Sequence, residues 1–259
     1  MRPASEAQRI VSLVPSLSEA LFALGLGARV VGVTDWCVHP AEAVAALPKV
    51  GGTKNPDLAR IRELSPDLVI ANREENRERD VERLREAGLP VWVTYPRTVE
   101  QAIGLLEEIA GLGAPEASGN TVLARVRDAF QARRALQVPN PTRVFCPIWK
   151  RPWMAVGSDT YADDLLGVCG GVNVFAARTE RRYPIVEESE IVASQPEVIL
   201  LPDEPYAFGL ADASELARLD IPAAQEGRIH CLDGTLVSWY GPRIAEALDQ
   251  IGALLHPPA

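Results

Sequence analysis

The chain has 259 residues, of which 47% are hydrophobic and 24% are charged, and its formal net charge is −9. A chain this acidic is not expected to bind nucleic acid as its main partner, because phosphate contacts need a basic face. No apolar run reaches the roughly 20 residues of a membrane-spanning helix. The first nine residues lack the apolar core of a signal peptide, which leaves two expectations open: a cytoplasmic chain, or one whose natural leader is missing.

The cysteines give no sign of a metal or redox site. None of the four forms a C-x-x-C pair, so neither a zinc site nor a redox dithiol is predicted. Four buried free thiols are expected, with one disulfide as the open alternative. The cysteines are Cys37, Cys146, Cys169 and Cys231.

The first half of the chain alternates short apolar runs with helical patterns. Strands are predicted at 10–14, 30–33, 68–71 and 91–94, and helices follow them, the strongly charged one at 72–87. Ser16 and Glu19 form the pattern of a capping box, which predicts that the first helix begins with Ser16 as its N-cap. Strands that alternate with helices predict a parallel sheet covered by helices.

One long helix is predicted from Pro115 to Leu136. Val122, Val126 and Phe130 recur at helical spacing, and the prolines that follow Val138 end the pattern. About 22 residues at roughly 1.5 Å each span about 33 Å, the width of a small domain. We interpret this helix as a spine between two lobes; the alternative is an ordinary sheet-covering helix inside one domain.

The pattern repeats after the long helix. Strands are predicted at 143–148, 198–201 and 228–232, and the segment 195–200 echoes 65–70. The fold class predicted is α/β, with two Rossmann-like lobes that have parallel sheets and are joined by one long interdomain helix. The predicted divisions are 1–113 for the N-terminal lobe, 114–138 for the helix and 139–259 for the C-terminal lobe.

Aromatic residues follow the predicted strands, where open parallel sheets bind their ligands. Four of the five tryptophans are placed in such loops, and only Trp92 is placed inside a strand. Together with arginines, these rings suit a flat chelate with carboxylate or amide edges, held between the lobes. The alternative is that the rings pack loops onto the sheets. The candidate ligand-binding residues are Trp36, Asn72, Arg73, Tyr95, Trp149, Trp153, Phe208, Trp239, Tyr240 and Arg243.

Catalytic and metal-binding patterns are missing from the sequence. It has no G-x-S-x-G, H-E-x-x-H, P-loop or G-x-G-x-x-G motif, so neither an enzyme nor an intrinsic cofactor is predicted. Three histidines are too few for a direct metal site. His39 is a candidate axial ligand for a chelated metal, although a capping or surface role is preferred. Glu187, Glu188 and Glu190 cluster at a helix start, which the macrodipole explains; docking of a basic partner is the alternative.

Several short motifs carry a family resemblance. They are Arg9–Ser16, Val31–Thr34 and Ser65–Ala71 in the first half, and Cys169–Phe175, Gln195–Ile199 and Gly241–Arg243 in the second. The chain resembles the helical-backbone (class III) solute-binding proteins of ABC importers, of the vitamin B12-binding and iron-siderophore-binding type. This resemblance implies two lobes, a rigid helix between them and an interlobe ligand cleft. The stiff helix in turn predicts small closure on binding.

The resemblance also implies site residues. The family's aromatic contact after the second strand corresponds to Trp36, and its post-strand contact in the first lobe corresponds to Asn72. Its aromatic or basic contacts near the end of the chain correspond to Trp239 and Tyr240. The B12 binders have acidic and basic side chains where this chain has Thr235 and Trp239. Members of the family dock on a permease through one glutamate per lobe. The matching positions are Ala59, with Asp57 near it, and Ser189, between Glu188 and Glu190, so the docking candidates are Asp57, Glu188 and Glu190.

These observations lead to one main hypothesis. The chain is predicted to be a monomeric solute-binding protein that carries a metal chelate, a corrinoid or other tetrapyrrole first and a siderophore next, to an ABC importer permease. The resemblance implies an extracytoplasmic location, periplasmic or membrane-tethered. Two alternatives remain open: a cytoplasmic enzyme or carrier that handles such a chelate, and an interaction protein whose cleft is vestigial.

Overall fold

The computed structural model describes residues 7–136 and 138–257, and these divide into two compact units. Unit 1 holds residues 7–96, 100–126 and 240–242, and unit 2 holds the rest. The first six residues, part of the segment that lacks a signal-peptide pattern, lie outside the described residues. Within the described part of the chain, no helix is long and apolar enough to cross a membrane. The lobe boundaries at 113 and 139 stay a prediction.

Unit 1 is built on a parallel four-stranded sheet. Its order is β2-β1-β5-β6, and its strands are buried because both faces are covered by helices. A two-stranded antiparallel ladder, β3 with β4, stands beside it. The strands of the unit are β1 (Ile10–Ser12), β2 (Val30–Val33), β3 (Gly51–Gly52), β4 (Asn55–Pro56), β5 (Leu68–Asn72) and β6 (Val91–Thr94).

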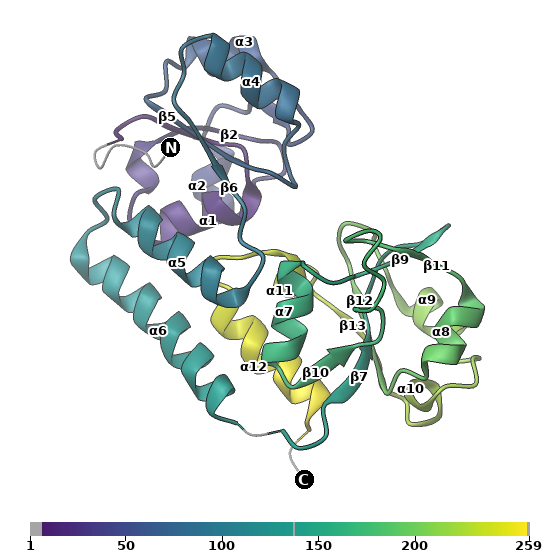
Figure 1. The fold of residues 1–259 in the computed structure, drawn as a ribbon. Coiled ribbons are helices and arrows are strands. Elements are labelled where there is room, and N and C mark those ends of the chain that lie inside the picture. The colour runs from purple at the N-terminus through teal and green to yellow at the C-terminus, as the bar shows by residue number, and fades with distance from the viewer. Residues whose placement is uncertain (1–6, 137, 258–259) are drawn as a thin grey trace. The chain divides into compact units, whose positions relative to one another are not determined.

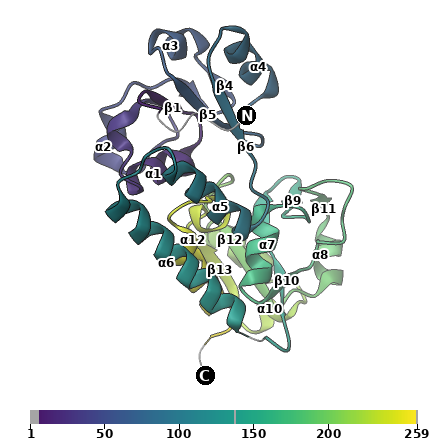
Figure 2. The ribbon, with the colours of Figure 1, turned by 60° about the vertical axis from the view of Figure 1, so that its left-hand side comes forward.

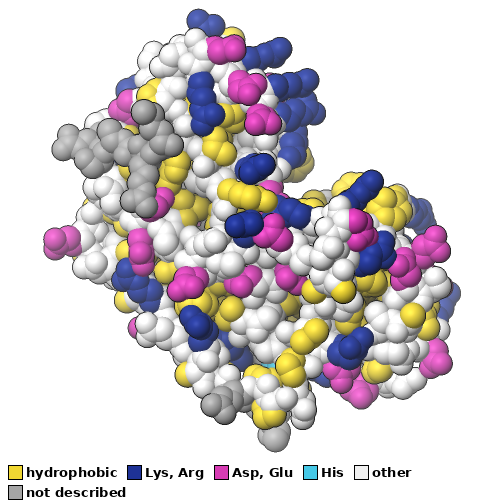
Figure 3. All heavy atoms as spheres, viewed as in Figure 1, with side chains coloured by type: hydrophobic (Ala, Val, Ile, Leu, Met, Phe, Trp, Pro, Cys, Tyr) yellow, Lys and Arg dark blue, Asp and Glu magenta, His cyan; other side chains and the backbone are white. Residues whose placement is uncertain are grey.

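Helices cover the two faces of this sheet. On one face, Ile61 of α3 and Val81 and Leu84 of α4 pack against Val11 and Val69 of the sheet. The side of α4 turned away from the sheet is exposed and carries charges of both signs, as predicted for a solvated face (Figure 3). The helices of the unit are α1 (Pro15–Ala23), the short 3-10 helix η1 (Gly27–Arg29), α2 (Ala41–Ala45), α3 (Leu58–Glu63), α4 (Glu78–Glu86) and α5 (Val99–Ala110) (Figure 1).

Unit 2 contains a second parallel sheet with the same topology. Its order is β10-β7-β12-β13, so in both sheets the second strand in the chain lies at one edge, followed by the first, third and fourth. An antiparallel sheet of order β11-β9-β8 was not predicted. The strands are β7 (Thr142–Phe145), β8 (Pro147–Trp149), β9 (Trp153–Ala155), β10 (Gly171–Asn173), β11 (Ile185–Val186), β12 (Val198–Pro202) and β13 (Ile229–Leu232).

Helices again lie on both faces of the parallel sheet of unit 2. α7 and α12 cover one face, and α8, α9 and α10 lie on the other (Figures 1 and 2). On the second face, Ile191 of α8 and Leu216 of α9 pack with Phe145, Ile199 and Leu201 of the sheet. The helices are α7 (Tyr161–Val168), α8 (Glu188–Ser194), α9 (Leu210–Leu216), α10 (Pro222–Gln225), α11 (Thr235–Ser238) and α12 (Ile244–Leu255).

The predicted long helix is α6 (Glu116–Ala135), with 20 residues. Pro115 precedes its first residue, which suits a helix start because proline has no N–H to satisfy. The boundary between the units falls inside this helix, after Val126. The fold class predicted from the sequence, two α/β lobes with parallel sheets, is confirmed.

Each unit contains the same arginine contact within itself, and the sequence did not reveal it. In unit 1 the backbone N–H of Arg9 donates to Asp67 at 2.9 Å, and its guanidinium donates to the carbonyls of Leu64 and Ser65. In unit 2 the backbone N–H of Arg143 donates to Glu197 at 2.7 Å, and its guanidinium donates to the carbonyls of Ser194 and Gln195. The same contact at equivalent strands extends the predicted internal repeat to side chains.

Two predicted helix starts are wrong. The first helix begins at Pro15 with Val14 as its N-cap, and no side-chain cap forms, so Ser16 is not the cap. Proline at the first helical position already has the helical φ, which moves the start one residue earlier. The charged helix begins at Glu78 rather than at Asn72, because β5 extends to Asn72 and a turn follows it.

The placement of two tryptophans in loops is also wrong. Trp149 ends β8 and Trp153 begins β9, so both belong to the antiparallel sheet. The expectation of four buried thiols needs one correction as well. All four cysteines are free, but Cys231 is exposed, because it lies in the edge strand β13.

Candidate functional site

The carboxyl end of β2 in unit 1 presents an exposed aromatic ring. Trp36 is 66% exposed, whereas its neighbour Cys37 is fully buried. The thiol of Cys37 lies 3.1 Å from the hydroxyls of both Ser18 and Thr34, and these contacts fix the loop from inside. Burial raises the pKa of the Cys37 thiol, which therefore stays protonated and serves packing. The loop thus holds Trp36 outward on a fixed base.

The glycine pair of the next loop makes room beside Trp36. A Cβ on Gly52 would lie 2.5 Å from the side-chain oxygen of Asn55 and 3.6 Å from the indole nitrogen of Trp36. Gly51 has a φ of +82°, a left-handed conformation that favours glycine. The two glycines therefore let the β3–β4 ladder approach the tryptophan loop closely.

Asn72, at the carboxyl end of β5, is buried and fully engaged. Its side-chain oxygen accepts hydrogen bonds from the backbone N–H groups of Glu74 and Glu75, and its amide donates to the carbonyl of Thr94 at 3.0 Å. The backbone N–H of Asn72 donates to Asn76, 2.8 Å away. Asn72 is therefore a turn-forming residue, and its predicted ligand contact stays a prediction.

Two further candidates of unit 1 lie together beside this turn. Arg73 is exposed, and its guanidinium carbon lies 5.2 Å from the ring centroid of Tyr95, which follows β6. β5 and β6 are neighbours in the sheet, so both residues leave the same edge. A cation over an aromatic ring gives this edge a positive group that can meet an anionic or amide edge of a ligand.

The carboxyl end of the parallel sheet in unit 2 carries a row of four aromatic rings. Trp153 and Phe208 stack with centroids 5.9 Å apart and planes 4° apart, Tyr206 lies 4.6 Å from Phe208, and Trp149 meets Tyr206 edge-on at 5.6 Å. Phe208 is buried, whereas Trp149 is 42% exposed. We call these four residues the aromatic row; its inner rings belong to the core and its outer rings reach the surface.

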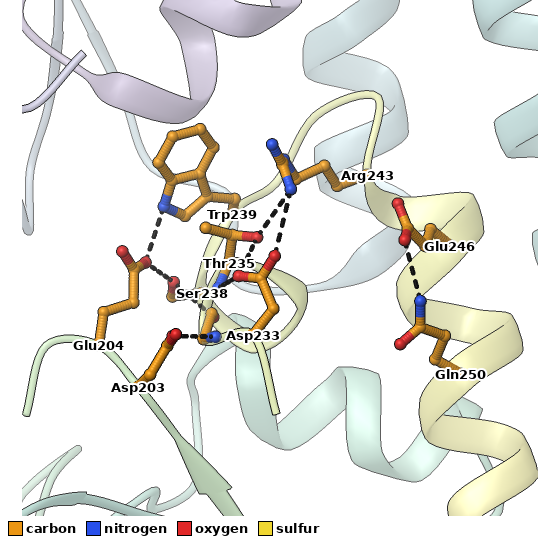
Figure 4. A network of polar contacts seen from close by, with 10 residues as sticks. Asp203, Glu204, Asp233, Thr235, Ser238, Trp239, Arg243, Glu246 and Gln250 are labelled. Atoms are coloured by element: carbon orange, nitrogen blue, oxygen red, sulfur yellow. Dashed lines mark hydrogen bonds and ion pairs between the residues drawn. The ribbon is translucent and has the colours of Figure 1, made fainter. Parts of the chain in front are cut away.

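A polar network lies where the neighbouring strands β12 and β13 end (Figure 4). Glu204 accepts hydrogen bonds from the indole N–H of Trp239 at 2.8 Å and from the hydroxyl of Ser238 at 2.7 Å. Asp203 accepts one from the backbone N–H of Gly234 at 2.7 Å. These bonds fix the loop after β13 against the loop after β12.

Arg243, at the start of α12, completes this network. Its guanidinium donates to the hydroxyl of Thr235 at 3.1 Å, lies 3.4 Å from a carboxylate oxygen of Asp233, and stands 5.3 Å from the centroid of Trp239 (Figure 4). Trp239 itself is only 7% exposed. The guanidinium is thus already paired with an acid and an aromatic ring inside unit 2.

The balance of charge at this edge of unit 2 is acidic. In the polar network, the carboxylates of Asp203, Glu204 and Asp233 stand with the guanidinium of Arg243. Carboxylates accept several hydrogen bonds each, so this edge suits donors such as amide N–H groups. The sequence search missed these three acids because it considered aromatic and basic residues after each strand, although Asp203 and Glu204 directly follow β12.

The remaining candidates are spread over the two units. Asp57 caps α3 by accepting from the backbone N–H of Arg60 at 3.0 Å. Glu188 is exposed in the first turn of α8, and Glu190 is half-buried there. His39 is half-buried, and Tyr240, assigned to unit 1, is buried. The described residues contain no group of three or more His, Cys, Asp or Glu that could hold a metal ion.

A periplasmic binding protein family model matches residues 10–236. The chain belongs to this family. Its members are solute-binding proteins rather than enzymes, and they carry ligands rather than intrinsic cofactors. The prediction of a binding protein is therefore confirmed, and the alternative of an enzyme is not supported.

Individual relatives match this chain over nearly its whole length. A vitamin B12-binding protein of Vibrio cholerae is 27% identical over 246 residues, 95% of this chain and 88% of the relative. The solved vitamin B12-binding protein BtuF of Vibrio cholerae has a TM-score of 0.81 at 25% identity, covering 96% of each chain. The solved periplasmic heme-binding protein RhuT of Roseiflexus sp. RS-1 has a TM-score of 0.81 at 27% identity, covering 96% of this chain and 98% of that one.

Proposed function

We propose that this chain binds a metal chelate with a flat macrocyclic ring, a corrinoid or other tetrapyrrole before a siderophore, and delivers it to an ABC importer permease. One observation carries the proposal: each unit of this family member presents a large exposed tryptophan at the carboxyl end of its parallel sheet, Trp36 in unit 1 and Trp149 in unit 2. An exposed tryptophan leaves a large apolar surface in water, and this surface marks a place where a ligand can bind. A flat conjugated ring is the ligand that stacks on it best.

The charge of unit 2 favours one class of macrocycle. A corrinoid carries amide side chains that donate hydrogen bonds, whereas haem carries carboxylates. The edge with Asp203, Glu204 and Asp233 accepts from amides and repels carboxylates, and Arg243 is already paired there. Names of relatives support both ligands, since one set is called B12-binding and another heme-binding. We therefore place a corrinoid first.

Delivery and location follow from the family and are part of the proposal. The relatives are periplasmic binding proteins, which supports an extracytoplasmic place of action and a permease as partner. Of the three docking candidates, Asp57 and Glu188 are exposed. Glu190 already pairs with Arg178, so it contributes less to a docking surface. We expect the chain to act as a monomer.

The experiment is a titration with cyanocobalamin, haemin and a ferric siderophore, followed by tryptophan fluorescence and by the thermal midpoint. A ligand present at 100 times its dissociation constant adds about 2.7 kcal/mol, which moves the midpoint of a chain this size by several degrees. We expect cyanocobalamin to bind more tightly than haemin, and Trp36→Ala to weaken binding at least tenfold without a change in the unliganded midpoint. Leu136→Ala removes another exposed apolar side chain and serves as the control.

Three outcomes would contradict the proposal. Equal affinity of Trp36→Ala and the unchanged chain removes the stacking role. Tighter binding of haemin reverses the order of ligands. No shift with any chelate favours the interaction protein.

A further inference from the structure

A lysine ammonium is buried at the tip of the β8–β9 hairpin. Lys150 is only 8% exposed, and its Nζ lies 2.6 Å from Oδ1 of Asp212 and 2.8 Å from Oε2 of Glu215. Lysine is almost never buried to this extent unless it is paired. Replacing a buried ion pair by apolar residues is often neutral or stabilising, so the pair is weak evidence for a role in stability. Its geometry points elsewhere.

The pair joins two segments that are distant in sequence. Lys150 lies between the antiparallel strands, and Asp212 lies in the first turn of α9. The other carboxylate oxygen of Asp212 accepts from the backbone N–H of Gly209 at 3.0 Å, which caps the same helix. A single carboxylate therefore fixes the start of α9 and, through the lysine, the tip of the hairpin.

The aromatic row is built on these same two segments. Trp149 and Trp153 flank Lys150 on the hairpin, and Tyr206 and Phe208 lie just before α9. The Nζ of Lys150 stands 5.2 Å from the ring centroid of Trp153. If the hairpin moved relative to α9, the stack of Trp153 on Phe208 and the contact of Trp149 with Tyr206 would both be lost. The ammonium thus links the two segments whose relative position determines the arrangement of the aromatic row.

We propose that Lys150 and Asp212 are positioning residues that hold the aromatic row of unit 2 in place, so that Trp149 is pre-organised to stack on the ligand. This inference rests on the proposed function. The ion pair does not contact the ligand. It removes the conformational freedom that the hairpin would otherwise lose on binding, and such pre-organisation raises affinity by lowering the cost of ordering.

The test is a double-mutant cycle between Lys150→Met and Trp149→Ala, read as the dissociation constant of cyanocobalamin. Methionine keeps the length of the side chain and removes the charge. We expect Lys150→Met to weaken binding about tenfold in the unchanged chain and less than twofold in the Trp149→Ala background, because the lysine acts through that ring. Arg178→Met, which breaks the ion pairs of Arg178 with Glu180 and Glu190 in the same unit, is the control and leaves affinity unchanged.

A second readout needs no ligand. The near-ultraviolet circular dichroism of the free protein reports the fixed arrangement of the aromatic rings, and Lys150→Met is expected to reduce it while Arg178→Met is not. Asp212→Asn, which keeps the shape and an acceptor for Gly209, repeats both measurements if Lys150→Met fails to fold. An unchanged spectrum, or an equal loss of affinity in both backgrounds, would overturn the positioning role. If the unchanged chain binds no chelate but the spectrum responds as expected, the proposed function fails and the positioning of the row stands.

Discussion

At the scale of single residues, side chains of the same predicted site fall into different roles. Trp36 projects into solvent, Phe208 belongs to the core, and Asn72 holds a turn together. Residue type and position after a strand were the same kind of evidence for all three. What separates them is the number of neighbours each side chain meets, which depends on how loops pack on the sheet.

Replacement of Asn72 by alanine tests this view. The change removes the acceptor of the Glu74 N–H and the donor to the Thr94 carbonyl in a buried setting, so we expect the free energy of unfolding to fall by about 2 kcal/mol. Urea unfolding gives the value. The exposed neighbour Arg73, changed to alanine, serves as the control and is expected to lose less than about 0.5 kcal/mol. A similar small loss for Asn72→Ala would show that the turn does not depend on it.

At the scale of elements, the two units repeat each other in more than strand order. Arg9 and Arg143 make the same contacts to an acid and to the end of the helix that leads into the third strand of the parallel sheet, α3 in unit 1 and α8 in unit 2. Each contact stands at the start of the first strand of its parallel sheet, β1 in unit 1 and β7 in unit 2. The helix starts differ instead: α8 has a capping box between Glu187 and Glu190, whereas α3 is capped by Asp57 alone. Predicted docking residues thus also serve as caps.

Glu190 and Glu188 allow the capping and docking roles to be separated. The side chain of Glu190 accepts from the backbone N–H of Glu187 at 2.9 Å and pairs with Arg178, whereas Glu188 is exposed. We expect Glu190→Ala to lower the free energy of unfolding by about 1 kcal/mol, as loss of a cap does, and Glu188→Ala to leave it unchanged. Thermal unfolding of both variants measures the difference. Equal midpoints would mean that the capping box adds nothing to stability.

At the scale of the whole molecule, the titration of one histidine links stability to pH. Burial, aided by the charge of Arg228, lowers the pKa of His230 below its ordinary value of about 6.5. The unfolded chain therefore binds more protons than the folded chain between the lowered pKa and about 6.5. Stability rises with pH through that window, is lowest below it, and is unaffected by this group above about 6.5.

The effect of His230 is measured by comparing the unchanged protein with the variant His230→Gln. The urea midpoint of the unchanged protein is expected to rise between pH 5 and pH 7.5 by more than that of His230→Gln, because glutamine does not titrate. Comparing the two slopes cancels the contribution of all other groups. Parallel slopes would show that His230 has the same pKa in the folded and unfolded states.

Family membership is also a property of the whole chain rather than of any motif. Each motif is short, but together they run in order from residue 9 to residue 243, and the periplasmic binding protein family matches residues 10–236. The sequence was sufficient here because buried parallel strands need continuous apolar runs, and these runs are visible without coordinates. The same reasoning predicted α6, since a period of 3.6 residues and terminal prolines are local signals.

By itself, then, the sequence determined the α/β class, the repeat of two sheets, the long helix and the kind of ligand to test. The first three depend on periodicity and composition, which are local, whereas the kind of ligand rests on the aromatic residues that follow the strands and on the family resemblance. Only the tertiary structure decided which rings are exposed, that Trp149 and Trp153 belong to a small antiparallel sheet, and that Lys150 is buried against Asp212. The burial of Lys150 depends on a contact between residues 62 positions apart, 150 and 212, and no local pattern specifies it.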